Sequence, residues 1–360
     1  MMNTVVGAIG ALVLLNVMLF VHEMGHFLAA KRSGVAVEEF GFGYPPRLVT
    51  LFRRGGTSYT LNMIPFGGFT RMKGEDDPEG PGSFVNARKR NRIVILLAGA
   101  GMNLLLAVAM FTGAFMVGYP EVQQGARVVG VLEGTAAAEA ELQVDDVILQ
   151  VNDQVLGDTG DLATYVETHP DEAVELAIRR GETLMFLDAH LRSNEGLGWL
   201  GIEFVPVIDL LRLPLHRALI QGLQSTGQFL WLTISLPALL LRGVIPLEAA
   251  RPVGPVGIYK IASSAAQYVL ASGRWFALLE LGGLLNAAVA LTNVLPLPGL
   301  DGGRLLFILA EALRGKRVAP EREGAIHFIG LVVLVLLAVF ITVQDIAGEV
   351  PMPDWSQFGL

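Results

Sequence analysis

The sequence contains no cysteine and few charged residues, and each shortage excludes a class of protein. Without cysteine, the 360-residue chain has no disulfide, no thiolate zinc site and no cysteine nucleophile, so a metal ion must be bound by His, Asp or Glu. Only 17% of the residues are charged and 52% are hydrophobic, with a mean hydropathy of +0.52, which is too apolar for an ordinary soluble protein. The net charge of -8 is unevenly distributed, so no uniform basic surface indicates a nucleic-acid partner.

Four apolar segments are long enough to cross a bilayer, which takes roughly 20 helical residues. They are Thr4 to Ala30, Ile93 to Val117, about Trp275 to Leu297 and about Ile326 to Val343. The first lacks a basic n-region and is longer than the core of a usual signal peptide, so it is interpreted as a retained span. The sequence therefore predicts a multi-pass α-helical membrane protein.

Basic residues predict the orientation, because Lys and Arg are retained on the cytoplasmic side. Eleven of them lie between the first two spans, and five more follow the third. The region from Glu121 to Arg192 is acid-rich and is predicted to lie outside, together with both termini. The apolar stretch Gly227 to Leu241 is short and follows several glutamines, so we interpret it as an interfacial or partly inserted helix. A further span would place Asp301 on the opposite side of the membrane from His22.

Two extramembrane segments have strand character. Arg47 to Phe52 and Ser58 to Ile64 flank an Arg-Arg-Gly-Gly turn, a pattern typical of a hairpin on the cytoplasmic side. Such a hairpin either packs against the spans or presents a strand edge to an unwound substrate. In the outer region, 127–132, 146–151, 173–179 and 184–191 have strand composition, and 158–167 has that of a helix.

The first span contains His22, Glu23 and His26 in the pattern His-Glu-x-x-His. Residues four apart project from one helical face, so both imidazoles can bind one zinc ion while Glu23 stands beside the open ligand position. Zinc with three protein ligands keeps that position for water, and Glu23 would act as the general base. A chance match is the alternative, but ionisable groups inside a span are expensive and usually functional.

A hydrolytic zinc site needs a third ligand, and Asp301 is the best candidate. It follows Pro296, Pro298 and Gly299 and precedes two glycines that allow close approach of the backbone to a metal ion. Asp301 could instead cap the helix from Gly302 to Leu313. The topology favours ligation, since it places Asp301 at the depth of His22 and His26.

Two side-chain amides in the predicted spans are further candidates. Asn293 ends the third span close to Asp301, and Asn103 lies within the second span. Each could hold a substrate backbone near the zinc ion or form hydrogen bonds between helices. We assign both to substrate binding.

These motifs resemble those of the site-2 protease family of intramembrane zinc metalloproteases, especially the bacterial regulator of sigma-E protease group. Phe20 to Phe27 looks like the family's first-span motif, Asn293 to Gly303 looks like its third-span motif, and Arg251 to Ile258 is similar to a family segment before the third span. The resemblance implies one Zn²⁺ per chain on His22, His26 and Asp301, with Glu23 as the base.

The resemblance also implies one extracytoplasmic PDZ domain, a membrane-reentrant β-loop and location in the bacterial inner membrane. It implies regulated intramembrane proteolysis of single-pass membrane proteins, such as anti-sigma factors or signal-peptide remnants, which an upstream site-1-type protease shortens first. The chain departs from the family at Ala100, where proline is common, and in a PDZ turn that lacks the usual Gly, Pro and Gly.

We accordingly divide the chain into nine segments. These are a first span with the His-Glu-x-x-His motif (1–36), a β-hairpin loop and basic linker (37–92), a second span (93–119), a PDZ-like α/β domain (120–193), an amphipathic or interfacial region (194–273), a third span (274–303), a cytoplasmic helix or loop (304–325), a fourth span (326–346) and a tail (347–360). A scaffold without activity and an ion transporter are the alternative functions, and the intact His, Glu and Asp constellation argues against both.

Overall fold

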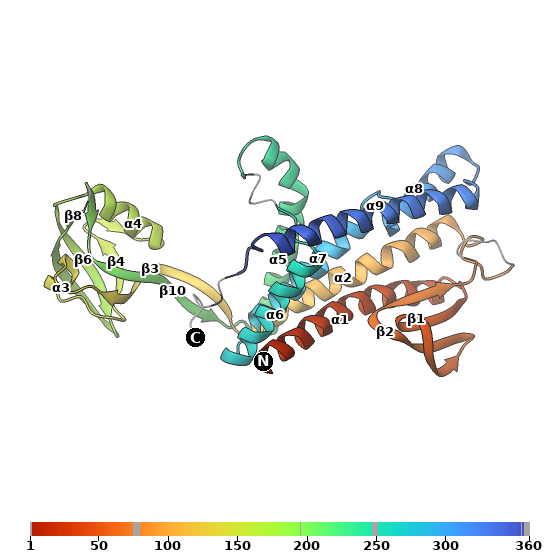
Figure 1. Cartoon of the computed structure of the whole chain (residues 1–360), viewed down its shortest axis with the longest axis horizontal. Coiled ribbons are helices and arrows are strands. Elements are labelled where there is room, and N and C mark those ends of the chain that lie inside the picture. Colours follow the sequence, from red (N-terminus) through yellow and green to blue (C-terminus); the bar gives the residue numbers. More distant parts are fainter. Residues whose placement is uncertain (1, 75–79, 195, 247–250, 354, 356–360) are drawn as a thin grey trace. The chain divides into compact units, whose positions relative to one another are not determined.

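The computed structural model describes residues 2–74, 80–194, 196–246, 251–353 and 355. They form two compact units, one of residues 1–118 with 213–353 and the other centred on residues 119–212. Only part of the predicted tail at 347–360 therefore falls within the described residues. The first unit contains the long helices and one β-hairpin, and the second is mainly β-sheet with two short helices (Figure 1).

Four helices are long and apolar enough to cross a membrane, as the sequence predicted. They are α1 (Met2–Arg32), α2 (Lys89–Val117), α7 (Phe276–Val294) and α9 (Pro320–Ala347). The third span ends three residues earlier than expected. Leu295 leaves the helix with φ -59° and ψ 140° because Pro296 follows it, and a residue before proline is sterically disfavoured in the α conformation.

Small residues allow α1 and α2 to lie side by side in the first unit (Figure 1). Gly25 of α1 faces the backbone of Ala98 on α2, so closely that any side chain at Gly25 would overlap the Ala98 carbonyl. Gly99, which follows Ala98 on α2, lies in turn against α1. In lipid the hydrophobic effect does not drive helices together, so their association depends on close packing. Glycine permits that packing because it lets the two backbones approach each other.

The hairpin between α1 and α2 is longer than predicted. It consists of β1 (Val37–Arg54) and β2 (Thr57–Met72), which pair antiparallel around the turn at Gly55 and Gly56. Buried Glu39 accepts hydrogen bonds from Arg47 and Thr60. Burial alone would raise the pKa of Glu39, but these hydrogen bonds and the two nearby arginines lower it. The hairpin contacts α1, and Thr70 of β2 donates to the carbonyl oxygen of Glu23.

The segment between the second unit and α7 forms two helices. The first, α5 (Leu215–Leu241), packs on α2 through Gly222, whose Cα faces Thr112. It is not among the helices that are long and apolar enough to be candidate membrane spans. The second, α6 (Pro255–Ser272), packs on α1 where Gly7 meets Ser263 and Gly10 meets Ala266.

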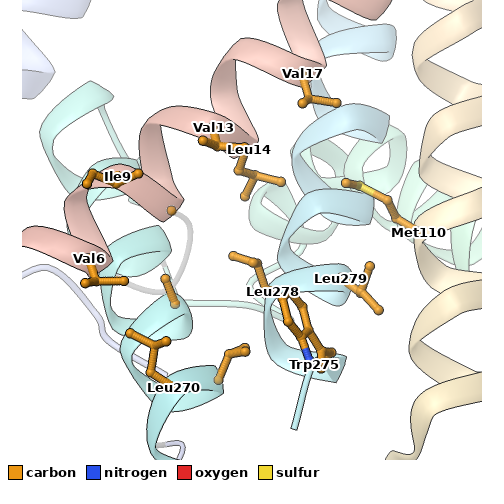
Figure 2. A pocket seen from close by; sticks show the side chains of 13 residues that line it. Val6, Ile9, Val13, Leu14, Val17, Met110, Leu270, Trp275, Leu278 and Leu279 are labelled. Atoms are coloured by element: carbon orange, nitrogen blue, oxygen red, sulfur yellow. The ribbon is translucent and has the colours of Figure 1, made fainter. Parts of the chain in front are cut away.

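An apolar cavity of about 560 Å³ lies between α1, α6 and α7. Figure 2 shows side chains from these helices and Met110 of α2 around it. None of the residues that line this cavity is titratable, so it cannot supply acid, base or metal-ligand chemistry.

The amphipathic helix α8 (Asp301–Arg314) follows the turn after α7. The last turn of α8 contacts the start of α2 through an ion pair of 2.7 Å between Glu311 and Arg92. Both side chains are largely buried. This ion pair fixes α8 against α2 and thereby restrains the helix that begins at Asp301.

The second unit contains a sheet in which the main strand order is β10-β3-β4-β6-β7. Its elements are β3 (Tyr119–Val131), α3 (Ala136–Glu139), β4 (Val147–Val151), β5 (Gln154–Val155), α4 (Thr159–Thr168), β6 (Ala173–Arg180), β7 (Thr183–His190), β8 (Arg192–Asn194), β9 (Leu197–Trp199) and β10 (Ile202–Leu211). The four predicted strands and the helix capped by Asp158 are all present. The unit reaches residue 212 instead of 193, because β10 pairs with β3 along ten residues and completes the sheet.

Candidate active site

Helix α1 presents two imidazoles on one face. His22 and His26 are one helical turn apart and both are buried. Their Nε2 atoms lie 3.1 Å from each other, and the two rings meet edge to face with an interplanar angle of 79°. The i, i+4 spacing therefore brings the two Nε2 atoms close enough to bind one metal ion, as the sequence predicted.

Asp301 meets this pair from the opposite side of the site. Its Oδ2 lies 3.2 Å from Nε2 of His22 and 3.3 Å from Nε2 of His26. Asp301 is the first residue of α8, and the capping position belongs to Leu300, where no side chain caps the helix. The carboxylate is thus directed at the imidazoles, and the capping alternative does not describe this structure.

The turn before α8 sets the position of Asp301. Gly302 and Gly303 lie against the backbone carbonyls of Leu295 and Leu297, where side chains would not fit. The backbone N–H of Gly299 donates to Nδ1 of His327 on α9, at 3.0 Å. The turn is consequently held both by its own backbone and by the fourth span.

The three ligand atoms fit a zinc ion. In a tetrahedral site with bonds of about 2.0–2.2 Å to nitrogen or oxygen, neighbouring ligand atoms lie about 3.3–3.5 Å apart. The distances of 3.1, 3.2 and 3.3 Å between the three atoms are close to that spacing. Among the residues that the structure describes, His22, His26 and Asp301 are the one group of three or more His, Asp or Glu residues with this arrangement. Two imidazoles and one carboxylate form a donor set of the catalytic type, which leaves one position open.

Glu23 opens onto a cavity of about 530 Å³ that also reaches the three ligand residues. Besides these, the cavity is lined by polar side chains from the hairpin, from α7, from α8 and from α9, namely Tyr44, Thr70, Asn293, Arg304 and His327. Glu23 follows His22 directly in the sequence and shares this cavity with both imidazoles, so a water molecule in the cavity can reach its carboxylate.

The two predicted amides occupy different places. Asn293 lines the cavity, as a substrate-binding role requires. Asn103 is completely buried and does not line it, and its amide lies 3.4 Å from Nδ1 of His22.

Sequence reasoning did not single out several residues of the site. Gly99 lies against both imidazoles, and Tyr44, Arg304 and His327 line the cavity. The Ala-Gly-Ala-Gly run of the second span carried a signal of close helix packing. Tyr44, Arg304 and His327 are remote in sequence from the His-Glu-x-x-His motif, and no local pattern connects them to it.

Comparisons with known proteins show which family the chain resembles. The model of peptidase family M50 matches residues 10–337. The chain is 31% identical to a protein of Clostridium perfringens, over 93% of this chain and 97% of that protein. It is 27% identical to the zinc metalloprotease RasP of Oceanobacillus iheyensis and 28% identical to RasP of Shouchella clausii, in each case over 96% of this chain and 99% of the relative. Among solved structures, the PDZ domain of an SdrC-like protein from Listeria monocytogenes matches 22% of this chain and 87% of its own length, with 20% identity and a TM-score of 0.21.

Proposed function

Since this chain belongs to peptidase family M50 and is a zinc metalloprotease of the site-2 protease family, we propose that it hydrolyses peptide bonds of single-pass membrane proteins within the bilayer. The observation that carries the proposal is the convergence of His22, His26 and Asp301 beside Glu23, on helices that include a membrane span. Ionisable side chains are energetically costly within a membrane, and those that occur in spans usually serve a function.

Each residue of the site has a proposed role. His22, His26 and Asp301 hold one zinc ion per chain, and Glu23 is the general base. A zinc ion with an open position supplies Lewis acidity, which polarises the scissile carbonyl and lowers the pKa of water. The Glu23 carboxylate accepts a proton from the attacking water and then donates it to the leaving amine nitrogen. Asn293, which lines the same cavity, binds the substrate backbone.

A substrate helix must unwind before its peptide bonds can react, because its backbone groups are hydrogen-bonded within the helix. Tyr44 of β1 and Thr70 of β2 line the cavity together with Glu23, so the hairpin reaches the catalytic groups. An unwound segment can add to the hairpin as a further strand and thereby come within reach of Glu23.

The proposed setting is the bacterial inner membrane. The catalytic site lies toward the cytoplasm, and the PDZ-like unit and both termini lie outside. The basic residues between α1 and α2 support this orientation. We further propose that the substrates are anti-sigma factors or signal-peptide remnants in regulated intramembrane proteolysis, after an upstream site-1-type protease has shortened them.

The proposal is tested with purified full-length protein and a model single-pass substrate in detergent. Glu23→Gln removes the base and leaves the three ligands, so cleavage should fall by at least about 100-fold while one zinc ion per chain is retained. Glu139→Gln, a substitution of an exposed glutamate in α3 of the other unit, is the matched control and should cleave like the wild type. Wild-type turnover by Glu23→Gln would contradict the assigned mechanism.

A further inference from the structure

The geometry points to Asn103 as a positioning residue: its amide oxygen accepts the Nδ1–H of His22 and so fixes the tautomer in which Nε2 of His22 is free to bind zinc. This inference rests on the proposed function and deepens it. It replaces the substrate-binding role predicted for Asn103, which does not line the catalytic cavity.

The two nitrogens of His22 have different surroundings. Nε2 faces Oδ2 of Asp301 and Nε2 of His26, which makes it the nitrogen that would bind a metal ion. A ligand nitrogen must offer a lone pair, so the proton of neutral His22 has to reside on Nδ1. The amide of Asn103 is the group that faces Nδ1, at 3.4 Å.

The orientation of the Asn103 amide decides whether this contact helps or prevents zinc binding. If Nδ2 faces His22, then Nδ1 must accept, the proton moves to Nε2 and the ligand is blocked. In that orientation Oδ1 of Asn103 is also buried without a hydrogen-bond partner. A rotation of the amide by 180° exchanges its nitrogen and oxygen and gives Oδ1 the Nδ1–H of His22. Only this orientation is compatible with a metal ion on Nε2.

The second imidazole shows the same arrangement without ambiguity. Nδ1 of His26 lies 2.8 Å from the backbone carbonyl oxygen of Ile95, which can only accept. Nδ1 of His26 therefore carries a proton, and in the neutral imidazole Nε2 has the lone pair that binds a metal ion. Ile95, Gly99 and Asn103 follow one another at intervals of four on α2 and share one face of that helix. This face of α2 supplies an acceptor for each imidazole, with Gly99 between the two acceptors.

Zinc affinity of the full-length protein, measured by competition with a chromophoric chelator, tests the inference. Asn103→Leu keeps the number and branching of the side-chain heavy atoms and removes the acceptor, so zinc should bind about 10- to 100-fold more weakly, the usual effect of losing an outer partner of a ligand histidine. Asn103→Asp restores an acceptor and should bring the affinity back to within about threefold of the wild type.

Asn286→Leu is the matched control. Asn286 is also wholly buried in a span with an unsatisfied Oδ1, but its amide donates to the carbonyl of Gly282 and does not touch a ligand. This substitution should leave zinc affinity unchanged even if the protein unfolds at a lower temperature. Wild-type zinc affinity in Asn103→Leu, or an Asn103→Asp variant that binds as weakly as Asn103→Leu, would overturn the inference and leave the proposed function intact. A wild-type protein that binds no zinc would instead defeat the proposed function.

Discussion

Gly99 of α2 lies so close to His26 of α1 that a Cβ atom at position 99 would be 2.5 Å from Nε2 of the imidazole. The same Cβ would lie 2.7 Å from Nε2 of His22. Carbon and nitrogen atoms that are not bonded do not approach to such distances, so a side chain at position 99 would displace both imidazoles or separate the two helices. The absence of a side chain at this position is thus a condition for the metal site.

Gly99→Ala should weaken zinc binding severely and abolish cleavage, because the added methyl group occupies the space of the imidazoles. Gly101→Ala is the control from the same helix, since a Cβ at that position meets nothing within 4 Å. Alanine is favoured over glycine in a helix by about 1 kcal/mol, so Gly101→Ala should be active and no less stable. Zinc content and substrate cleavage of both variants check the prediction, and an active Gly99→Ala protein would refute it.

Removal of the metal ion should abolish proteolysis reversibly. We expect a chelator to remove one zinc ion per chain and to stop cleavage, because only the bound ion supplies the Lewis acid. Added zinc should restore cleavage. Asp301→Ala should not regain activity under these conditions, since the remaining two imidazoles make an incomplete donor set. Metal analysis alongside the cleavage assay measures both effects. Full turnover by metal-free protein would rule out the zinc mechanism.

The ion pair between Arg92 and Glu311 should stabilise the fold of the first unit. Arg92→Leu removes the shorter and more buried partner of the Glu311 carboxylate, which then keeps only its longer contact to exposed Lys89, so the loss should approach about 3–5 kcal/mol. The double substitution Arg92→Leu with Glu311→Leu should recover most of this loss. Lys89→Leu removes a longer and more exposed contact to the same Glu311, at 3.6 Å, and should cost no more than about 1 kcal/mol. Denaturant unfolding in detergent measures all four proteins, and equal losses for Arg92→Leu and Lys89→Leu would contradict the assignment.

Single-cysteine labelling tests the proposed orientation cleanly, because the chain has no cysteine of its own. A membrane-impermeant maleimide applied to intact cells that have a permeable outer envelope should label Glu182→Cys in the loop between β6 and β7. It should label Asn86→Cys, in the segment before α2, only after the inner membrane is opened. Both positions are exposed in the structure, so a difference reflects the side of the membrane. The reverse pattern would invert the proposed topology.

The sequence by itself determined the membrane spans and the His-Glu-x-x-His pair, because both depend on local periodicity. Apolar runs of sufficient length predict spans wherever they lie, and two histidines four residues apart share a face on any helix. Four strands of the second unit, β3, β4, β6 and β7, were likewise predicted from composition. The short β5, β8 and β9 were not predicted, and neither was β10, whose place in the sheet depends on pairing with a strand about 80 residues earlier.

Only the tertiary structure decided which partners meet across distant parts of the chain. Asp301 lies 279 residues from His22, and its local sequence permits either a helix cap or a ligand. The contact of Asn103 with His22 and the close approach of Gly99 to both imidazoles depend on how α1 crosses α2. These relationships arise from the packing of whole helices, which no local pattern encodes, and the sequence could therefore name the candidate ligands but not the residues of α2 that support them.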